Sequence, residues 1–311
     1  MELIIFISIA LASLIVLLFS AHYLIIAISG YSRKTGLSDY LIGFFIISIG
    51  TALPELSTAL VSSMFGKGQL SIGDVIGSNT LDLTLVLGAI LLVAGTIKVR
   101  NKNIKETIIT IFLMASLPLL LGIDGVLSRV DGLILLVAFL IYATSILTRE
   151  VSSVKLKKDV KLKFLLKDMS IFILALIALL LSTRWLVWST LQLSSQFSIP
   201  IFLIGSVFLA TATILPELTV GIKSVIKKKQ DLIFGDTFGS VVVNSTLVVG
   251  IAALINPIPL QLSGFVISSI FMLLCVALGY LMIRKKELNW KHGLLFISLY
   301  VLFILIQVAI G

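Results

Sequence analysis

The sequence has 311 residues, of which 59% are hydrophobic and 13% are charged, with 24 basic and 15 acidic side chains. Several apolar runs reach the roughly 20 residues that cross a bilayer as a helix, which excludes a soluble globular protein. A net charge of +9 is also typical of nucleic-acid binding, but the positions of the basic residues exclude that class.

We predict an all-α polytopic membrane protein with ten spans. In chain order they cover approximately 3–28, 40–64, 71–95, 106–123, 130–148, 169–190, 200–225, 233–255, 264–283 and 293–310. The first, third, fifth, seventh and ninth connections together hold 21 of the 24 basic residues. Because basic loops stay in the cytoplasm, these connections are expected inside the cell and both termini outside.

The chain is predicted to divide into two halves of five spans. Residues 1–148 form the first half and 169–311 the second, joined by a basic cytoplasmic linker at 149–168. Lysines beside a membrane also attract anionic lipids, which is a second interpretation of the linker. Because each half has an odd number of spans, the second half enters from the opposite side, as in inverted-topology repeats.

An internal repeat supports this division. Four blocks of the first half recur 162 residues later, with partial identity. The blocks begin at Leu41, Gly50, Gly73 and Leu85 and recur at Leu203, Ala212, Gly235 and Leu247. Four blocks at one constant offset indicate duplication.

The second block places a proline and a glutamate inside an apolar span of each half. Pro54 precedes Glu55, and Pro216 precedes Glu217. A proline inside a helix costs about 3 kcal/mol, and a charged side chain at the bilayer centre costs roughly another 3 kcal/mol. The repetition of both costs predicts two carboxylates that face each other at mid-membrane.

Further oxygen atoms lie near the two glutamates in the sequence. Asp82 and its counterpart Asn244 lie midway through the third and eighth spans. The candidate site adds the hydroxyls of Thr51, Thr213, Ser78 and Ser240 and the backbone carbonyls near Ser48–Gly50 and Ala210–Ala212, which the prolines release. We also expect Gly77-Ser78 and Gly239-Ser240 to loosen their helices.

Oxygen ligands select hard cations such as Ca2+ and Na+. The two histidines, His22 and His292, lie far from these motifs in the sequence, which argues against zinc or copper as the natural substrate. Cys275 is the single cysteine, so an internal disulfide is excluded.

The paired motifs Gly50–Glu55 and Gly73–Asn79, with their counterparts, resemble the alpha repeats of the cation/calcium exchanger superfamily, and most closely its prokaryotic sodium/calcium exchanger family. The resemblance covers essentially the whole chain and implies an antiporter that exchanges Ca2+ for Na+. It implies a diamond of sites between Glu55, Glu217, Asp82 and Asn244, with Ca2+ between the glutamates and Thr51 and Thr213 contributing. It also implies sodium sites towards each face, helped by Ser78 inside and Ser240 outside. The first and sixth spans would slide to alternate access.

Two departures from the family pattern bear on sodium. Ala52 and Ile214 stand where the family has serine, so each flanking sodium site would lose a hydroxyl. The aspartate lies in the first repeat, at Asp82, and the asparagine in the second, whereas several relatives have the reverse. Three carboxylates carry a total charge of −3. Three Na+ would neutralise this charge, whereas one Ca2+ would leave a net charge of −1.

Two alternatives remain open. A proton-coupled exchanger of Ca2+ or another divalent cation needs carboxylates but no hydroxyl cage, although the glutamate motif common in such relatives is absent. An intramembrane protease is disfavoured, because the aspartyl motif fails at Ser71 and Ile233 and no zinc motif is present. Asp74 and Asp236 are interpreted as residues that cap or lead into helices, or that line an ion entrance. We therefore expect a cell-membrane transporter without a cofactor, an obligate protein partner or enzymatic activity.

Overall fold

The computed structural model describes residues 2–35, 48–98, 102–151, 162–226, 230–283 and 287–310. Most of these residues are helical, as the composition predicts. Seven helical segments in these ranges are long and apolar enough to cross a membrane. They are Leu3–Ala27, Gly68–Ala94, Met169–Phe197, Ile201–Ile226, Ile233–Ile255, Leu262–Met282 and Trp290–Ile310.

The helices and strands follow one another in a pattern that recurs in the second half. The first half contains α1 (Glu2–Thr35), α3 (Ser48–Thr51), α4 (Leu53–Met64), α5 (Gly68–Leu81), the π-helix η2 (Asp82–Val86), α6 (Leu87–Ala94), β1 (Thr96–Lys98), α7 (Lys102–Leu121), the 3-10 helix η3 (Gly122–Asp124), β2 (Val126–Leu127) and α8 (Arg129–Val151). The second half contains α9 (Leu162–Phe197), α10 (Ile201–Ile204), the π-helix η4 (Gly205–Leu209), α11 (Ala210–Thr213), α12 (Leu215–Ile226), α13 (Gln230–Val242), the π-helix η5 (Val243–Val248), α14 (Val249–Ile255), β3 (Ile258–Pro259), α15 (Leu262–Ile283), β4 (Glu287–Asn289) and α16 (Trp290–Ile310).

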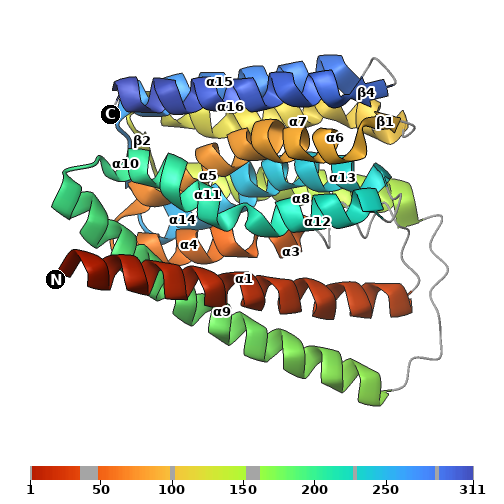
Figure 1. The fold of residues 1–311 in the computed structure, drawn as a ribbon, viewed down its shortest axis with the longest axis horizontal. Coiled ribbons are helices and arrows are strands. Elements are labelled where there is room, and N and C mark those ends of the chain that lie inside the picture. Colours follow the sequence, from red (N-terminus) through yellow and green to blue (C-terminus); the bar gives the residue numbers. More distant parts are fainter. Residues whose placement is uncertain are drawn as a thin grey trace.

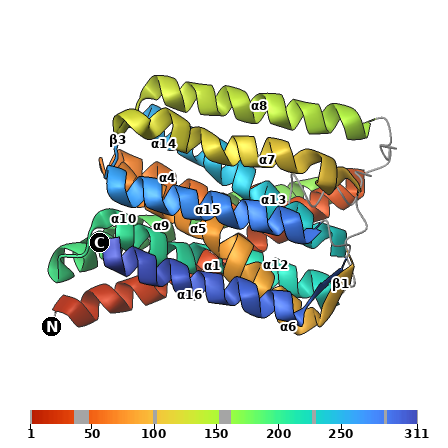
Figure 2. The ribbon, with the colours of Figure 1, turned by 90° about the horizontal axis from the view of Figure 1, so that it is seen from above.

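Two rods lie at the centre of the bundle: α5 with η2 and α6, and α13 with η5 and α14 (Figures 1 and 2). In these rods 83% and 78% of the most apolar window is buried, against 22% in α1 and in α16. The central rods therefore pack against protein on nearly every side, whereas α1 and α16 turn most of their apolar surface outward.

The long helices α1 and α9 lie together along one side of the molecule (Figure 1). Small and apolar residues such as Ala10, Leu17 and Ala21 of α1 and Leu179 and Leu186 of α9 form an apolar cluster separate from the main core. Both helices extend beyond the spans predicted for them, 3–28 and 169–190. The connection between α8 and α9 is also shorter than the predicted linker at 149–168, because α8 continues to Val151 and α9 begins at Leu162. Residues 152–161 of that linker, like the repeat block that begins at Leu41, lie outside the described residues.

Two short antiparallel ribbons lie at opposite ends of the bundle (Figure 1). One pairs β1 with β4, with Ile97 opposite Leu288, and the other pairs β2 with β3, with Leu127 opposite Ile258. These four side chains are buried. Each ribbon joins a strand of the first half to a strand of the second, so the two halves are tied together at both ends.

The two Pro-Glu motifs interrupt their helices as the sequence predicts. One residue, Ala52 or Ile214, separates each short upstream helix from the helix that carries the glutamate. The loosening predicted at Gly77-Ser78 and Gly239-Ser240 is wrong, because α5 and α13 run through these residues without a break. The irregular turns begin later, as π-helices at Asp82 and Val243.

Candidate cation site

Glu55 and Glu217 are each the third residue of the helix that follows a break, α4 and α12. The N-terminal end of a helix carries unpaired N–H groups and a partial positive charge, which favour a carboxylate there. Glu55 is 0% exposed and Glu217 is 2% exposed. Within the described part of the chain, none of their four carboxylate oxygens has a hydrogen-bond partner. Two carboxylates without partners in a protein core require another source of positive charge.

Asp82 is the third carboxylate that the sequence predicts for this site. It is fully buried at the start of η2, and both of its oxygens lack a hydrogen-bond partner among the described residues. Coulombic repulsion acts between Glu217 and each of Glu55 and Asp82. The structure therefore brings these three predicted residues into one electrostatic cluster.

Asn244 is oriented by Asn79, a residue that the sequence interpretation did not assign to the site. The Asn244 amide nitrogen donates to Asn79 Oδ1 at 3.2 Å, and Asn79 Nδ2 donates in turn to Ser245 Oγ at 2.9 Å. With its nitrogen held in this way, Asn244 keeps its amide oxygen buried and without a partner among the described residues. An oxygen presented like this can accept a cation.

The two predicted threonines each contact an aspartate of the opposite half. Thr213 donates to Asp74 Oδ1 at 3.0 Å and also lies 3.1 Å from the Ser78 hydroxyl. Thr51 donates to Asp236 Oδ1 at 3.1 Å. Ser78 and Thr213 both lie near the Glu55 carboxylate. Thus Thr213 and Ser78 adjoin the electrostatic cluster directly.

The interpretation of Asp74 and Asp236 as helix caps is wrong. Both lie inside α5 and α13, and they are 0% and 4% exposed. Their position raises the number of buried carboxylates around the site from the three counted in the sequence to five. The Gly-Asp pair recurs in both motifs, and this repetition is a sequence signal for the two aspartates. A single sequence does not show, however, that each aspartate accepts a hydrogen bond from a threonine of the other half.

The remaining predicted residues are already engaged in local hydrogen bonds. The Ser48 carbonyl accepts from Ala52 N at 3.0 Å, and the Ala210 carbonyl accepts from Ile214 N at 3.1 Å. Ser240 donates to the Asp236 carbonyl at 2.8 Å, one turn earlier in α13. The carbonyls that lose their usual helical donor are those of Gly50 and Ala212, since Pro54 and Pro216 have no N–H.

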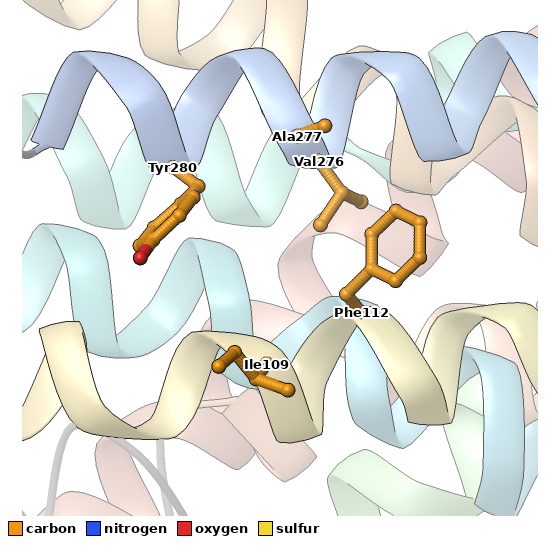
Figure 3. Close-up of a pocket in the computed structure, with 5 residues that line it drawn as sticks. All are labelled: Ile109, Phe112, Val276, Ala277 and Tyr280. Atoms are coloured by element: carbon orange, nitrogen blue, oxygen red, sulfur yellow. The ribbon is translucent and has the colours of Figure 1, made fainter.

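No group of three Asp, Glu, His or Cys side chains within the described ranges is close enough together to hold a metal ion. A pocket elsewhere, between α7 and α15, is lined by Ile109, Phe112, Val276, Ala277 and Tyr280 (Figure 3). Because Ile109 is 67% exposed and the lining is mostly apolar, this outer pocket does not suit an ion.

Comparisons with known proteins agree with the resemblance seen in the motifs. The sequence profile of the sodium/calcium exchanger protein family matches residues 5–148 and 167–309. The chain is 31% identical to inner membrane protein YrbG of Escherichia coli, over 86% of this chain and 88% of that protein. It is 26% identical to uncharacterized membrane protein MJ0091 of Methanocaldococcus jannaschii, over 94% of each. A solved structure of the sodium-calcium exchanger NCX_Mj has a TM-score of 0.73 at 24% identity, covering 97% of this chain and 98% of that one.

Proposed function

Because this chain belongs to the sodium/calcium exchanger family, we propose that it exchanges Ca2+ for Na+ across the cell membrane by alternating access. It is a membrane antiporter rather than an enzyme. The transported ions are its substrates, and the mechanism needs no cofactor or obligate protein partner.

The observation that carries this proposal is the pair Glu55 and Glu217, which are buried at helix breaks and whose carboxylate oxygens have no hydrogen-bond partner among the described residues. Removing a carboxylate from water costs several kcal/mol unless a counter-charge offsets it. Ca2+ between the two glutamates would supply that charge, and Na+ would supply it in the alternate load. Competition for the same oxygens is the physical basis of exchange.

The proposed ligand set is the one that the sequence predicts. Glu55, Glu217, Asp82 and the Asn244 oxygen form the central diamond, and Thr51 and Thr213 contribute hydroxyls to Ca2+. Ser78 and Ser240, with the backbone near Ser48 and Ala210, would serve sodium. Binding would require these side chains to move until their oxygens lie about 2.3–2.6 Å from Ca2+, because no group of three acidic side chains in the described ranges is close enough together to hold a metal ion.

We also propose the ten-span arrangement as two inverted repeats. The helices α3–α4, α7 and α8 occupy the three predicted positions that are not among the seven long apolar segments. A shift of 162 residues carries α3 (Ser48–Thr51) onto α11 (Ala210–Thr213) and α4 (Leu53–Met64) onto α12 (Leu215–Ile226).

The ribbons support the same symmetry. The shift of 162 residues carries β1 onto β3 and brings β2 within β4, so each ribbon pairs one strand of each kind. The ribbons lie at opposite ends of the bundle, as an inverted repeat requires (Figure 1). The two termini lie at one end, which we assign to the extracellular side, and the basic linker at 149–168 then separates the repeats in the cytoplasm.

A proton-coupled exchanger is the second candidate function. Ala52 and Ile214 are both 1% exposed and place no hydroxyl beside the cluster, which weakens the case for sodium. Protons would bind to the carboxylates alone and would need no hydroxyl ligands. The two candidates differ in the gradient that drives calcium uptake.

The test is calcium uptake into proteoliposomes under a sodium gradient or a pH gradient, with wild type, Glu55→Gln and Glu217→Gln. We expect sodium-driven uptake by wild type and loss of uptake in both variants, because each removes a shared ligand charge. Glu287→Gln, an exposed glutamate in β4, is the matched control and should transport normally. Wild-type uptake driven only by a pH gradient would show that the coupling ion is the proton and not sodium. Transport at the wild-type rate by either variant would refute the proposed site.

A further inference from the structure

Asp74 and Asp236 are buried carboxylates that the calcium site does not use. Asp74 Oδ1 accepts from Thr213, while Asp74 Oδ2 has no hydrogen-bond partner among the described residues. The Ser78 and Thr58 hydroxyls lie near this carboxylate. Thr58 is 0% exposed, and its hydroxyl has no hydrogen-bond partner among the described residues either. Oxygen atoms from α4, α5 and α11 thus gather around Asp74 with unused acceptor capacity.

Asp236 has a matching environment in the other half. Its Oδ1 accepts from Thr51, and Ser48 Oγ lies 3.3 Å from the Gly235 carbonyl and 3.4 Å from the Asp236 carbonyl. The aspartate comes from one half and the threonine from the other, as at Asp74. The two arrangements are therefore related by the repeat.

Each threonine hydroxyl is set to accept a cation. Thr213 Oγ1 lies 3.0 Å from Asp74 Oδ1 and 3.3 Å from the Ala210 carbonyl, and a hydroxyl has one proton to donate. Donation to the charged group at the shorter distance leaves the oxygen lone pairs available and increases the negative charge on that oxygen. The same argument holds for Thr51, at 3.1 Å from Asp236 and 3.3 Å from the Ser48 carbonyl.

We propose that Asp74 and Asp236 are additional carboxylate ligands of the two monovalent-cation sites that the family resemblance implies on either side of the calcium position, with Asp74 beside Thr213 and Ser78, and Asp236 beside Thr51. This inference rests on the proposed function, because it assigns the binding of Na+ to named residues. The carboxylates compensate for the hydroxyls that Ala52 and Ile214 lack. Binding of a cation also offsets the cost of burying each carboxylate.

The two subsites are not equivalent. Thr58 of the first half corresponds to Val220 in the second, and Ser71, whose buried hydroxyl lacks a partner among the described residues, corresponds to Ile233. The Asp236 subsite has the Ser48 hydroxyl where the Asp74 subsite has Ala210. The Asp74 subsite, however, holds two buried side-chain oxygens without a hydrogen-bond partner among the described residues, Asp74 Oδ2 and Thr58 Oγ1. It should bind the monovalent cation more tightly.

The test is calcium binding by the purified full-length protein, titrated by calorimetry at increasing Na+ concentration and fixed pH. The variants are Asp74→Asn, Asp236→Asn and Thr58→Val, and Asp124→Asn in an exposed turn is the control. We expect Asp74→Asn to change the sodium-free calcium affinity much less than the sodium affinity, because Asp74 acts on calcium only indirectly, through the Thr213 hydroxyl that donates to it. It should raise the Na+ concentration for half-displacement about tenfold or more, since contacts to a charged group are worth roughly that factor. Asp236→Asn should have a smaller effect, and Thr58→Val should weaken Na+ without changing calcium binding.

Several outcomes would overturn the inference. These are unchanged sodium displacement in both aspartate variants, a loss of calcium affinity equal to the loss of sodium affinity, or an effect that appears only as a changed pH dependence of calcium binding. If Asp74→Asn does not yield a monodisperse protein, Thr58→Val and Asp236→Asn carry the test alone. Failure of Na+ to displace Ca2+ from wild type would instead refute the proposed sodium coupling.

Discussion

The mirrored positions Asp82 and Asn244 carry different charges, which makes them informative about the site. Each lies at the start of a π-helix in a central rod, and each is 0% exposed. The asparagine nitrogen is held by Asn79, whereas neither Asp82 oxygen has a hydrogen-bond partner in the described part of the chain. These two corners of the proposed diamond therefore carry one negative charge between them, at Asp82. We expect transport to tolerate that charge at either of the two positions.

We predict that Asp82→Asn lowers calcium uptake at least about tenfold, because a buried charge contact is worth roughly 1.5–3 kcal/mol. The double variant Asp82→Asn/Asn244→Asp should recover a large part of the loss. Asn79 can turn its amide and donate to the new carboxylate, since the Ser245 hydroxyl can donate as well as accept. Uptake in proteoliposomes is the measurement, with Asn244→Asp alone as the control. A double variant as inactive as Asp82→Asn would show that the two corners are not interchangeable.

The limits of the sequence are clear at this scale. A carboxylate beside a proline in an apolar span has no ordinary structural role, so the sequence alone predicts Glu55 and Glu217. An aspartate near the beginning of a span resembles a helix cap, so the sequence alone gives the wrong role for Asp74 and Asp236. Only their contacts with Thr213 and Thr51, more than 100 residues away, distinguish the two roles.

At the scale of elements, close approach of the helix backbones positions the site. A Cβ atom at Gly77 would lie 2.7 Å from the Ala210 Cβ and closer still to the Ser206 carbonyl oxygen. The absence of a side chain at Gly77 lets α5 contact η4 and α11 directly. This contact places Ser78 within 3.1 Å of Thr213.

We predict that Gly77→Ala destabilises the protein by roughly 1–3 kcal/mol, because overpacking against rigid backbone cannot be relieved by a rotamer change. Transport should fall with it, since α5 is displaced from α11. Gly264→Ala in α15 is the matched control: its Cβ would meet Phe202 at an ordinary 3.5 Å, and alanine favours a helix. Thermal unfolding in detergent compares the two. Equal unfolding temperatures would contradict the close-contact interpretation.

At the scale of the whole molecule, α1 and α9 form a unit beside the bundle (Figure 1). Their shared apolar cluster includes few residues of the central helices. A hydrogen bond of 2.7 Å between Ser57 of α4 and Thr183 of α9 connects this unit to the bundle near Glu55. If α1 and α9 slide during transport, as the family resemblance implies, this contact must break.

We predict that a disulfide between cysteines placed at positions 57 and 183 blocks transport, because it fixes α9 to α4. The 2.7 Å separation of the two hydroxyl oxygens is compatible with the short reach of a disulfide. The variant Ser57→Cys/Thr183→Cys should lose calcium uptake under oxidation and regain it on reduction, while still binding Ca2+. Each single variant is the control. Unimpaired uptake by fully cross-linked protein would refute the sliding of α9 past α4.

The sequence by itself determined the membrane class, the family resemblance, the helix breaks at the Pro-Glu motifs and the paired glutamates. These features depend on local composition, on proline chemistry and on the cost of charge in an apolar span, all of which can be read along the chain. Tertiary structure decided which residues lie around the proposed cation site. The cross-half contacts of Asp74 and Asp236, the orientation of Asn244 by Asn79 and the close packing at Gly77 arise from the interdigitation of the two halves. Hydrogen bonds and van der Waals contacts act over a few ångströms in space, and neighbours at that distance are not specified by their separation in the sequence.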